Sequence, residues 1–574
     1  MGSARLFAVL TVLAAVVIFL TVCTVKISNN STIITPRIKQ VTYLRYSSTK
    51  IPRLEQVTSP NKNDSKLTKT LHHEKIYSPN NTSTTPSYLE QVTCPNNTNV
   101  VVLSRDKVYH QGDVFTVRVV ARDKEGRPKT CGGDFFRARL LSINGSLQSS
   151  SAGHISDHCN GTYTVQFPLY WVGGASIRIQ LVHPSEAVKV LERVRETPNK
   201  RFFQCSFVDI KTKAKQTRQC YSTVNPSLPP HKLCDFSKRE VNGTWLCEKP
   251  EKLQCSTISL CRWDGGKSYK NAVNLVSKKE ATLFKKPYLE EELEVDPKEP
   301  IRVLETELTT PHHLPACTGN ARESGASLGH WSGKIWKSSV CNVQVFSKED
   351  IQRCLANKTV YMQGDSALLQ WTTRLQAVLP LSSNTDTMGA AASDGTPKRP
   401  PHVKGGDNSQ WNISVRFQFH HFPTQGHSWN YYYDFSYTAD VLDAMHGGPN
   451  TVVVLGLWAH FTAEPLEMFW SRLHAIRDAV HRLKRRSPGA LVFVRTGTTR
   501  DHAQGKLEFY LLNSDWLAYQ ITEVIREMFR ADPDVVVLDT WDMSVCQPGK
   551  DSVHPDQTMV DSQLNRLLSH ICPD

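Results

Sequence analysis

The sequence predicts a C-terminal α/β domain with a mostly parallel sheet, preceded by an all-β sandwich and a cysteine-rich segment. Three observations support this fold class. Apolar strands alternate with amphipathic helices after about residue 311, short alternating strands fill residues 96–200, and cysteines are dense in residues 201–265. At 574 residues the chain is also too long for one ordinary core, so several domains are expected.

The chain begins with an uncharged, mostly apolar stretch over residues 6–25, bracketed by Arg5 and Lys26. As a helix this stretch would span about 30 Å, the thickness of the hydrocarbon core of a bilayer. A cleaved signal peptide usually has a shorter apolar stretch. We therefore expect residues 1–26 to be a signal anchor, with a cleaved signal peptide as the alternative. The protein is expected in the secretory pathway, either in the Golgi membrane with its C-terminal part lumenal, or secreted.

Cysteine and asparagine usage indicates the same oxidising compartment. The chain has 15 cysteines, and all but Cys23 follow the apolar stretch, which leaves an even number for disulfides. No Cys-x2-Cys pair is present, so disulfides are favoured over zinc and no metal site is expected. The disulfide candidates are Cys131, Cys159, Cys205, Cys220, Cys234, Cys247, Cys255, Cys261, Cys317, Cys341, Cys354, Cys546 and Cys572. Glycosylation sequons in the folded part are Asn144, Asn160, Asn242, Asn357 and Asn412.

Residues 27–95 are rich in Ser, Thr, Asn, Pro and Lys, which predicts a disordered, glycosylated stalk. Residues 96–200 contain short alternating strands and predict an antiparallel β-sandwich that Cys131 and Cys159 could bridge. The cysteine-rich segment follows at residues 201–265. Residues 266–310 are charged and interrupted by prolines, and are expected to be a linker.

The predicted domain at residues 311–574 alternates strand and helix. Its expected strands, each followed by a helical pattern, are residues 359–362, 451–457, 490–494 and 535–538. This alternation predicts a parallel sheet covered on both faces, whose sites form beyond the carboxyl ends of the strands. Gly364-Asp365-Ser366 directly follows the first of these strands, where a nucleophile is expected.

A serine hydroxyl needs a base within hydrogen-bond reach and a third group that fixes the tautomer of that base. Asp551 and His554, three residues apart, supply both. Our hypothesis is therefore that Ser366 is the nucleophile, His554 the base and Asp551 its orienter. The backbone N–H of Ser366 is expected to stabilise an oxyanion, with Gly456 and His460 as further oxyanion or substrate-binding candidates. Rival bases without a motif are His420, His421, His427 and His502.

The order of these modules, together with four short motifs, resembles the NXPE family of neurexophilin and PC-esterase domain proteins. The motifs are Gly364-Asp365-Ser366, Gly456-Leu457-Trp458-Ala459-His460-Phe461, Asn513-Ser514-Asp515-Trp516 and His554-Pro555-Asp556. The resemblance implies a three-layer, SGNH-hydrolase-like PC-esterase domain and a neurexophilin-like sandwich. Two departures stand out: Ala367 replaces a usual threonine, and His421-Phe422 is placed where the family has His-Gly.

Relatives of this type include O-acetyltransferases that act on plant wall polysaccharides and on sialic acid. The resemblance therefore implies a glycan O-acetyltransferase or O-acetylesterase, with a sialoglycoconjugate as the leading acceptor and acetyl-CoA as a donor rather than a bound cofactor. The alternative is a catalytically inactive secreted ligand of a neurexin-like cell-surface adhesion receptor. The net charge of +14 is spread along the chain, which suits anionic glycans better than nucleic acid.

Overall fold

The computed structural model describes residue 89 and residues 91–573, apart from 104–107, 144–147, 297–298, 307–313, 319–327, 384–402, 424–428, 501–504 and 548–552. The expected anchor, most of the expected stalk, Asn144 and Asp551 lie outside the described residues. Within the described ranges, no helix combines the length and the apolar character needed to cross a bilayer.

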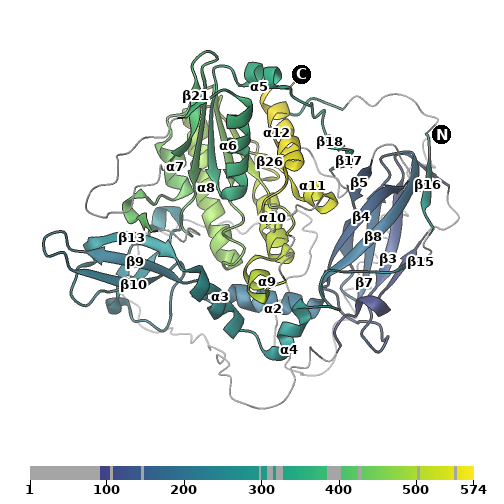
Figure 1. Ribbon diagram of the computed structural model, residues 1–574, viewed down its shortest axis with the longest axis horizontal. Coiled ribbons are helices and arrows are strands. Elements are labelled where there is room, and N and C mark those ends of the chain that lie inside the picture. The colour runs from purple at the N-terminus through teal and green to yellow at the C-terminus, as the bar shows by residue number, and fades with distance from the viewer. Residues whose placement is uncertain are drawn as a thin grey trace, which may run out of the picture. The chain divides into compact units, whose positions relative to one another are not determined.

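The C-terminal part contains a seven-stranded sheet in the order β20-β21-β22-β19-β24-β25-β26 (Figure 1). The five strands from β22 to β26 in this order run parallel, whereas β20 and β21 are antiparallel at one edge. Their bounds are β20 (Ser382–Ser383), β21 (Val403–Asn408), β22 (Ile413–Phe419), β19 (Thr359–Gly364), β24 (Thr451–Gly456), β25 (Leu491–Arg495) and β26 (Val536–Leu538). The predicted alternation of strands and helices is thus present.

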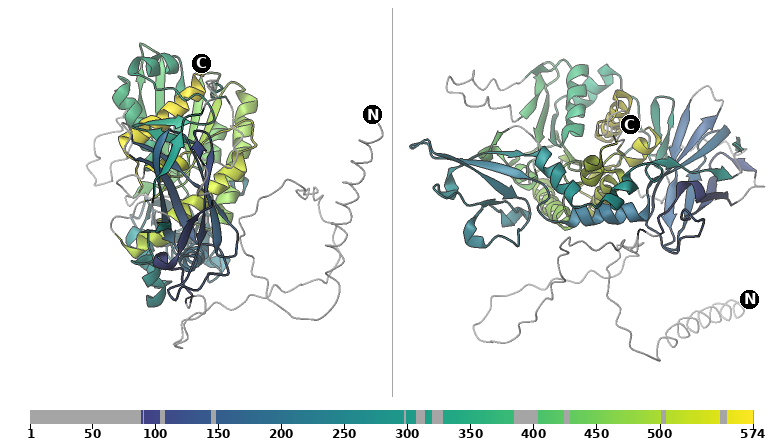
Figure 2. Two further views of the ribbon diagram at one scale, coloured as in Figure 1. Left: turned by 90° about the vertical axis from the view of Figure 1, so that its right-hand side faces the viewer. Right: turned by 60° about the horizontal axis from the view of Figure 1, so that its bottom comes forward.

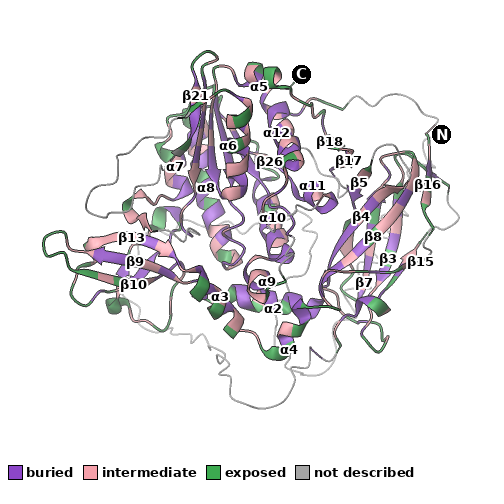
Figure 3. Cartoon of the chain, in the orientation of Figure 1, coloured by how far each residue is buried: buried purple, intermediate pink, exposed green. Residues whose placement is uncertain are grey.

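Helices cover both faces of this sheet. Successive residues of a strand point to opposite faces, so they pack against different helices. On β24, Val452 and Val454 pack with α6 (Ser366–Val378) and α12 (Gln557–Ile571). Val453 and Leu455 join a second core with α8 (Leu466–Arg486) and α10 (Asp515–Phe529). In Figure 3 the inner faces of these helices are buried and their outer faces are not. The remaining helices here are α5 (Lys348–Leu355), α7 (Thr438–Ala444), α9 (Leu507–Asn513) and α11 (Trp541–Cys546).

The N-terminal part is a sandwich of two mainly antiparallel sheets, visible from three sides in Figures 1 and 2. Val117, Val119, Val165 and Ile179 are fully buried between the sheets. One sheet has the order β15-β1-β3-β7-β6, and the other β18-β17-β5-β4-β8-β16-β2 with β14 beside β8. Bounds are β1 (Asn99–Val102), β2 (Tyr109–His110), β3 (Val114–Val120), β4 (Phe135–Ile143), β5 (Ser149–Ala152), β6 (His154–Asp157), β7 (Thr162–Pro168) and β8 (Gly173–His183).

Two segments that the sequence analysis placed outside the sandwich in fact complete it. The predicted linker at 266–310 is folded: it contains α3 (Gly265–Asn274), α4 (Lys278–Ala281), β14 (Glu291–Glu292), β15 (Val295–Asp296) and β16 (Ile301–Leu304). The hairpin of β17 (Gly329–Ser332) and β18 (Ile335–Ser338), expected in the C-terminal domain, pairs with β5 instead. The sandwich region also ends in a helix, α2 (Ser185–Glu196). The domain boundaries predicted at residues 266 and 311 rest on amino-acid composition, and composition does not show which strand a short strand will pair with.

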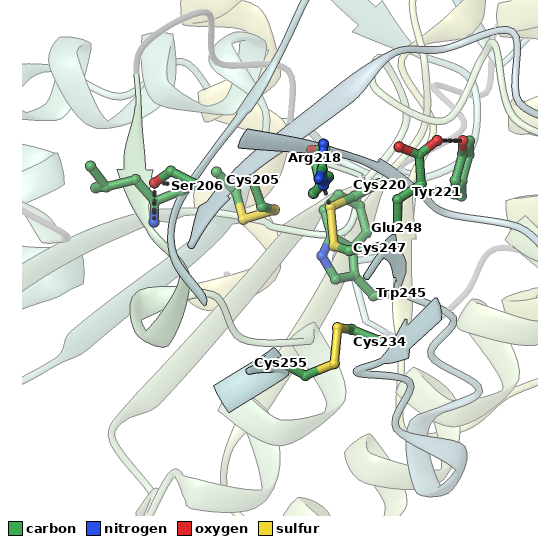
Figure 4. The surroundings of a disulfide bond; sticks show 12 residues. Cys205, Ser206, Arg218, Cys220, Tyr221, Cys234, Trp245, Cys247, Glu248 and Cys255 are labelled. Carbon is green, nitrogen blue, oxygen red and sulfur yellow. Dashed lines mark hydrogen bonds between the residues drawn. A yellow bond between two sulfur atoms is a disulfide. The ribbon is translucent and has the colours of Figure 1, made fainter. Parts of the chain in front are cut away.

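The cysteine-rich segment folds as a small sheet in the order β11-β12-β10-β9-β13-β23. Cys205 on β9 lies directly opposite Cys261 on β13, and Cys220 opposite Cys247, so each pair can bond across adjacent strands. Cys234–Cys255 completes this group (Figure 4). The strands are β9 (Phe203–Val208), β10 (Lys215–Tyr221), β11 (Leu233–Asp235), β12 (Leu246–Glu248), β13 (Ile258–Trp263) and β23 (Asn430–Tyr431).

Two further disulfides, Cys317–Cys341 and Cys354–Cys572, lie in the C-terminal part, and the disulfide-bonded fold fits a protein of the secretory pathway. Three predicted disulfide cysteines are free: Cys131, Cys159 and Cys546. The loops of Cys131 and Cys159 are joined by Asp157 instead, whose carboxylate accepts the N–H groups of Gly133 and Cys159, each at 2.8 Å. Cys546 is buried on α11 without a cysteine partner. The sequon residues Asn160, Asn242, Asn357 and Asn412 are exposed.

Candidate active site

Ser366 is the first residue of α6, which begins at the carboxyl end of β19. The preceding turn is tight because Gly364 has no side chain. A Cβ there would lie 2.5 Å from the carbonyl oxygen of Gly456 on the neighbouring strand. The N–H of Asp365 donates to that same carbonyl at 3.1 Å. The ends of β19 and β24 are thereby held together, and the serine projects at the edge of the sheet.

Asp365 fixes the nucleophile turn to the loop that follows β24. Its carboxylate caps α6 by accepting the N–H groups of Ala367 at 3.1 Å and Leu368 at 3.4 Å. The other oxygen accepts the N–H of Ala459 at 3.0 Å. The Asp365 side chain is fully buried, and this burial raises its pKa, while the cation of Arg495 opposes the rise. Asp365 therefore positions Ser366 rather than reacting itself.

His554, which is 188 positions after Ser366 in the sequence, lies beside it in the structure. Its Nε2 lies 2.8 Å from Ser366 Oγ. His554 lies in the loop before α12, directly ahead of Pro555, and Gln370 of α6 donates to the Pro555 carbonyl at 3.0 Å. Asp551 lies outside the described residues, so of the three predicted members the structure brings together Ser366 and His554.

The two further oxyanion candidates have other contacts. Gly456 offers its carbonyl, not its N–H, to the nucleophile turn, and a Cβ on it would press on Leu368 at 3.1 Å. His460 is half-buried, its carbonyl accepts from Arg201 at 2.9 Å, and its ring packs on that of His420 at 4.6 Å. Within the described residues, His460 makes no hydrogen bond to Ser366. The Asp365 cap uses the N–H groups of Ala367 and Leu368, leaving that of Ser366 at the start of the helix as the oxyanion candidate.

The rival bases do not reach the serine in the part of the chain that the structure describes. His420 is buried, which lowers its pKa to about 3, and its backbone N–H donates to the Gly364 carbonyl at 3.0 Å. The ring of His421 stacks on Phe435 and accepts the N–H of Ser436 at 3.3 Å. His427 and His502 lie outside the described residues.

Sequence reasoning missed the residues that support the pair. Gln370 gave no signal, because a glutamine on a helix is usually solvated. Arg495 and Arg500 are fully buried beside Trp371 and Trp458, with the guanidinium carbons 5.6 Å and 4.6 Å from the ring centroids. Arg495 could have been predicted to lie near the site, because it directly follows the apolar strand residues 491–494 and strand ends border the site.

The two departures from the family pattern are accommodated differently. Ala367 is completely buried within the capped first turn of α6. Phe422 adopts a φ of 52°, a left-handed conformation that suits glycine and is strained for a bulky residue. Its ring is held by stacking on Tyr437 at 4.4 Å. Packing thus retains a phenylalanine at a backbone position that glycine would adopt freely.

Comparison with known proteins gives two family matches and several distant structures. Residues 336–572 match the model described as "NXPE family member 4-like, C-terminal domain", and residues 55–280 match the neurexophilin model. Phospholipase A1 from Streptomyces albidoflavus NA297 is 16% identical, with 37% of this chain and 96% of that chain covered, at a TM-score of 0.19. An extracellular lipase from Streptomyces rimosus is 15% identical, with 37% and 97% covered, at 0.17.

The two family matches fall on the two ends of the described fold. The neurexophilin match includes the sandwich strands β1 to β8 and the cysteine-rich sheet up to β13, and the C-terminal match includes the parallel sheet with Ser366 and His554. The order of the two matches is the order that the sequence motifs predict. The chain belongs to the NXPE family.

Proposed function

We propose that this protein is a serine-dependent acyltransferase or esterase that acts on O-acetyl groups of glycans in the secretory pathway. The observation that carries the proposal is the 2.8 Å separation of Ser366 Oγ and His554 Nε2 at the carboxyl edge of a parallel sheet. This is the separation at which an imidazole can take the proton of a hydroxyl. The C-terminal fold is proposed to be of the SGNH-hydrolase type.

In the first half-reaction, Ser366 Oγ attacks the carbonyl carbon of an acetyl donor while His554 Nε2 takes the hydroxyl proton. The tetrahedral oxyanion is stabilised by the N–H of Ser366 at the start of α6. Collapse breaks the bond to the leaving group, which receives the proton from His554 and departs. The enzyme then carries an acetyl ester on Ser366.

In the second half-reaction, a sugar hydroxyl or water gives its proton to His554, and its oxygen attacks the acetyl ester. Ser366 leaves and recovers the proton from His554. A sugar acceptor makes the protein a transferase, and water makes it an esterase. Asp551 is proposed to hold the imidazole tautomer, with acetyl-CoA as donor and a sialoglycoconjugate as acceptor, in keeping with the family.

A fluorophosphonate probe tests the nucleophile directly. Wild-type protein secreted from cells is expected to be labelled at Ser366, and the variants Ser366→Ala and His554→Ala are expected to lose labelling by at least about a hundredfold. Ser227→Ala and His446→Ala change exposed residues of the same types and serve as matched controls. Undiminished labelling of Ser366→Ala with an unchanged melting temperature would refute the proposal.

A second function, a secreted ligand of an adhesion receptor, is favoured by the neurexophilin match over residues 55–280. It predicts receptor capture by protein that carries Ser366→Ala. An unlabelled wild-type protein that still captures a neurexin-type ectodomain would favour the ligand over the enzyme.

A further inference from the structure

The small sheet of the cysteine-rich segment has one closed face and one open face, because side chains alternate along each strand. The closed face holds the fully buried residues Phe203, Cys205, Phe207, Cys220 and Cys261. The open face carries side chains that are partly or largely exposed: Gln204, Val208, Lys215, Thr217, Gln219, Leu260 and Arg262. Ser206, on the same face, is buried, and its hydroxyl accepts the Leu260 N–H at 3.3 Å.

The register of the strands brings polar and aromatic side chains into one row across the open face. Gln219 on β10 lies opposite Gln204 on β9, which lies opposite Arg262 on β13. The Arg262 guanidinium donates to Gln204 Oε1 at 2.9 Å and lies 4.8 Å from the ring centroid of Trp429. Its ion pair with Asp264 is long, at 3.9 Å. Neighbouring strands are about 4.8 Å apart, so the row is about 14 Å long.

A group of aromatic rings lies at the β23 edge of this face. Tyr431 on β23 is opposite Leu260, two residues before Arg262, so it points to the open face. The ring of Tyr433, which is 64% exposed, lies 5.1 Å from that of Tyr431. Trp429, Tyr431 and Tyr433 lie outside the hydrophobic cores of the described residues. Uncovered aromatic side chains beside polar ones are typical of an interaction surface.

Positive charge lies at the other edge of the face. Lys215 is exposed at the start of β10, next to a turn that carries the exposed Lys211 and Lys213 (Figure 3). These three lysines make no ion pair within the part of the chain that the structure describes. The turn is held in shape because the Asp209 carboxylate accepts the N–H of Lys211 at 2.8 Å. The lysines are therefore available to an anionic ligand.

This combination of groups suits an acidic polysaccharide. The negative face of an aromatic ring attracts the C–H groups that a sugar ring presents on its less polar side. Glutamine amides both donate to and accept from hydroxyl groups, and lysine and arginine bind sulfate or carboxylate groups. A membrane fits less well. The anionic surface of a membrane is its cytoplasmic leaflet, whereas the three disulfides of this segment indicate an oxidising compartment.

We propose that the open face of this sheet, together with the β9–β10 turn, binds acidic polysaccharide chains that carry sulfate or carboxylate groups. The aromatic edge stacks on sugar rings, and Arg262 and Lys215 pair with the anionic groups. The length of the row fits several sugar rings, so the ligand is a chain rather than a monosaccharide. The site uses neither Ser366 nor His554 and is independent of the proposed acetyl transfer.

Interferometry on immobilised polysaccharides tests the site with full-length protein. Heparin is the sulfated probe, polysialic acid the carboxylated probe and dextran the neutral one. We expect binding to at least one acidic chain and not to dextran. This binding should weaken as sodium chloride rises from about 0.05 to 0.3 M, because salt screens exposed charges. Trp429→Ala and Lys215→Glu are each expected to weaken it by about tenfold.

Two matched variants serve as controls and should bind like the wild type. Trp470→Ala removes a partly exposed tryptophan of α8, and Lys337→Glu reverses an exposed strand lysine on β18. Binding of neither acidic chain, or equal binding of dextran, overturns the proposal, as does unchanged affinity in Lys215→Glu. Capture by phosphatidylserine vesicles but by no polysaccharide assigns the face to a membrane and also overturns it. If Trp429→Ala does not fold, Lys215→Glu decides, because its side chain is exposed.

Discussion

His420 follows β22 with both ring nitrogens buried and without a hydrogen-bond partner in the described part of the chain. Burial, assisted by the neighbouring His421, lowers its pKa from the ordinary 6.5 to about 3. Between these two values the unfolded chain binds more protons at this residue than the folded chain does. The free energy of unfolding therefore falls as the pH falls, by up to about 1.4 kcal/mol for each pH unit.

We expect His420→Phe to flatten the loss of stability between pH 6.5 and 4.5, because phenylalanine keeps the ring contact with Phe461 and takes up no proton. Urea unfolding at several pH values measures this, with the exposed His446→Phe as control. Asp134 affects the free energy of unfolding in the opposite direction. Burial raises its pKa to about 6, so the folded state takes up this proton before the unfolded state does, which offsets part of the loss of stability on acidification. An unchanged pH slope in His420→Phe would contradict the assignment.

At the level of elements, α6 and α12 are joined by side chains from the turns of α6 that follow Ser366. Arg374 of α6 pairs with Asp561 of α12 at 2.6 Å, and Trp371 Nε1 donates to Gln563 Oε1 at 2.9 Å. Gln370 adds the bond to Pro555, the residue after the histidine. The ion pair is partly exposed and contributes little to stability. Together these bonds fix the separation between nucleophile and base.

Gln370→Ala is therefore expected to slow fluorophosphonate labelling by about tenfold, less than the hundredfold that a 1 Å misplacement of reacting groups can cost. Its melting temperature should stay within a few degrees of wild type. Gln376→Ala is the matched control, since Gln376 lies on the same helix but donates to the Gly405 carbonyl, on β21. Equal labelling rates for the two variants would show that Gln370 does not position His554.

The strands and helices of the α/β part were predictable because their apolar periodicity is long and regular. The strand at 451–457, for example, is β24 with every residue buried. The pairing of Ser366 with His554 followed from motif and strand placement. By contrast, β17 and β23 are too short for a periodic signal, and their partners are non-local.

For the whole molecule, β17 and β23 show that the modules share sheets, because each strand pairs with a strand of another module. The β17–β18 hairpin extends the sandwich sheet, and Trp331 also donates to the Met543 carbonyl of α11 at 2.9 Å. Glu464 is 3% exposed and is held by Arg201 and Ser222, both outside residues 311–574. Removing the N-terminal modules would take both partners from this carboxylate and would expose apolar rings such as Phe422, which packs against Trp245 at 5.2 Å.

A fragment of residues 311–574 is accordingly expected to be poorly secreted and to aggregate, whereas residues 89–574 should be secreted and unfold cooperatively. Secretion yield, gel filtration and thermal unfolding compare the two. A 311–574 fragment that is secreted, melts like the longer protein and labels at the same rate would show that the α/β part is independent.

The Cys354–Cys572 bond joins residues 218 positions apart and encloses almost the whole α/β part, including the last helix, α12. A ribosome must deliver that entire length before this covalent ring can close. His554 arrives late in the same stretch of synthesis. Ser366 and His554 can therefore come together only after nearly all of the α/β part has been synthesised.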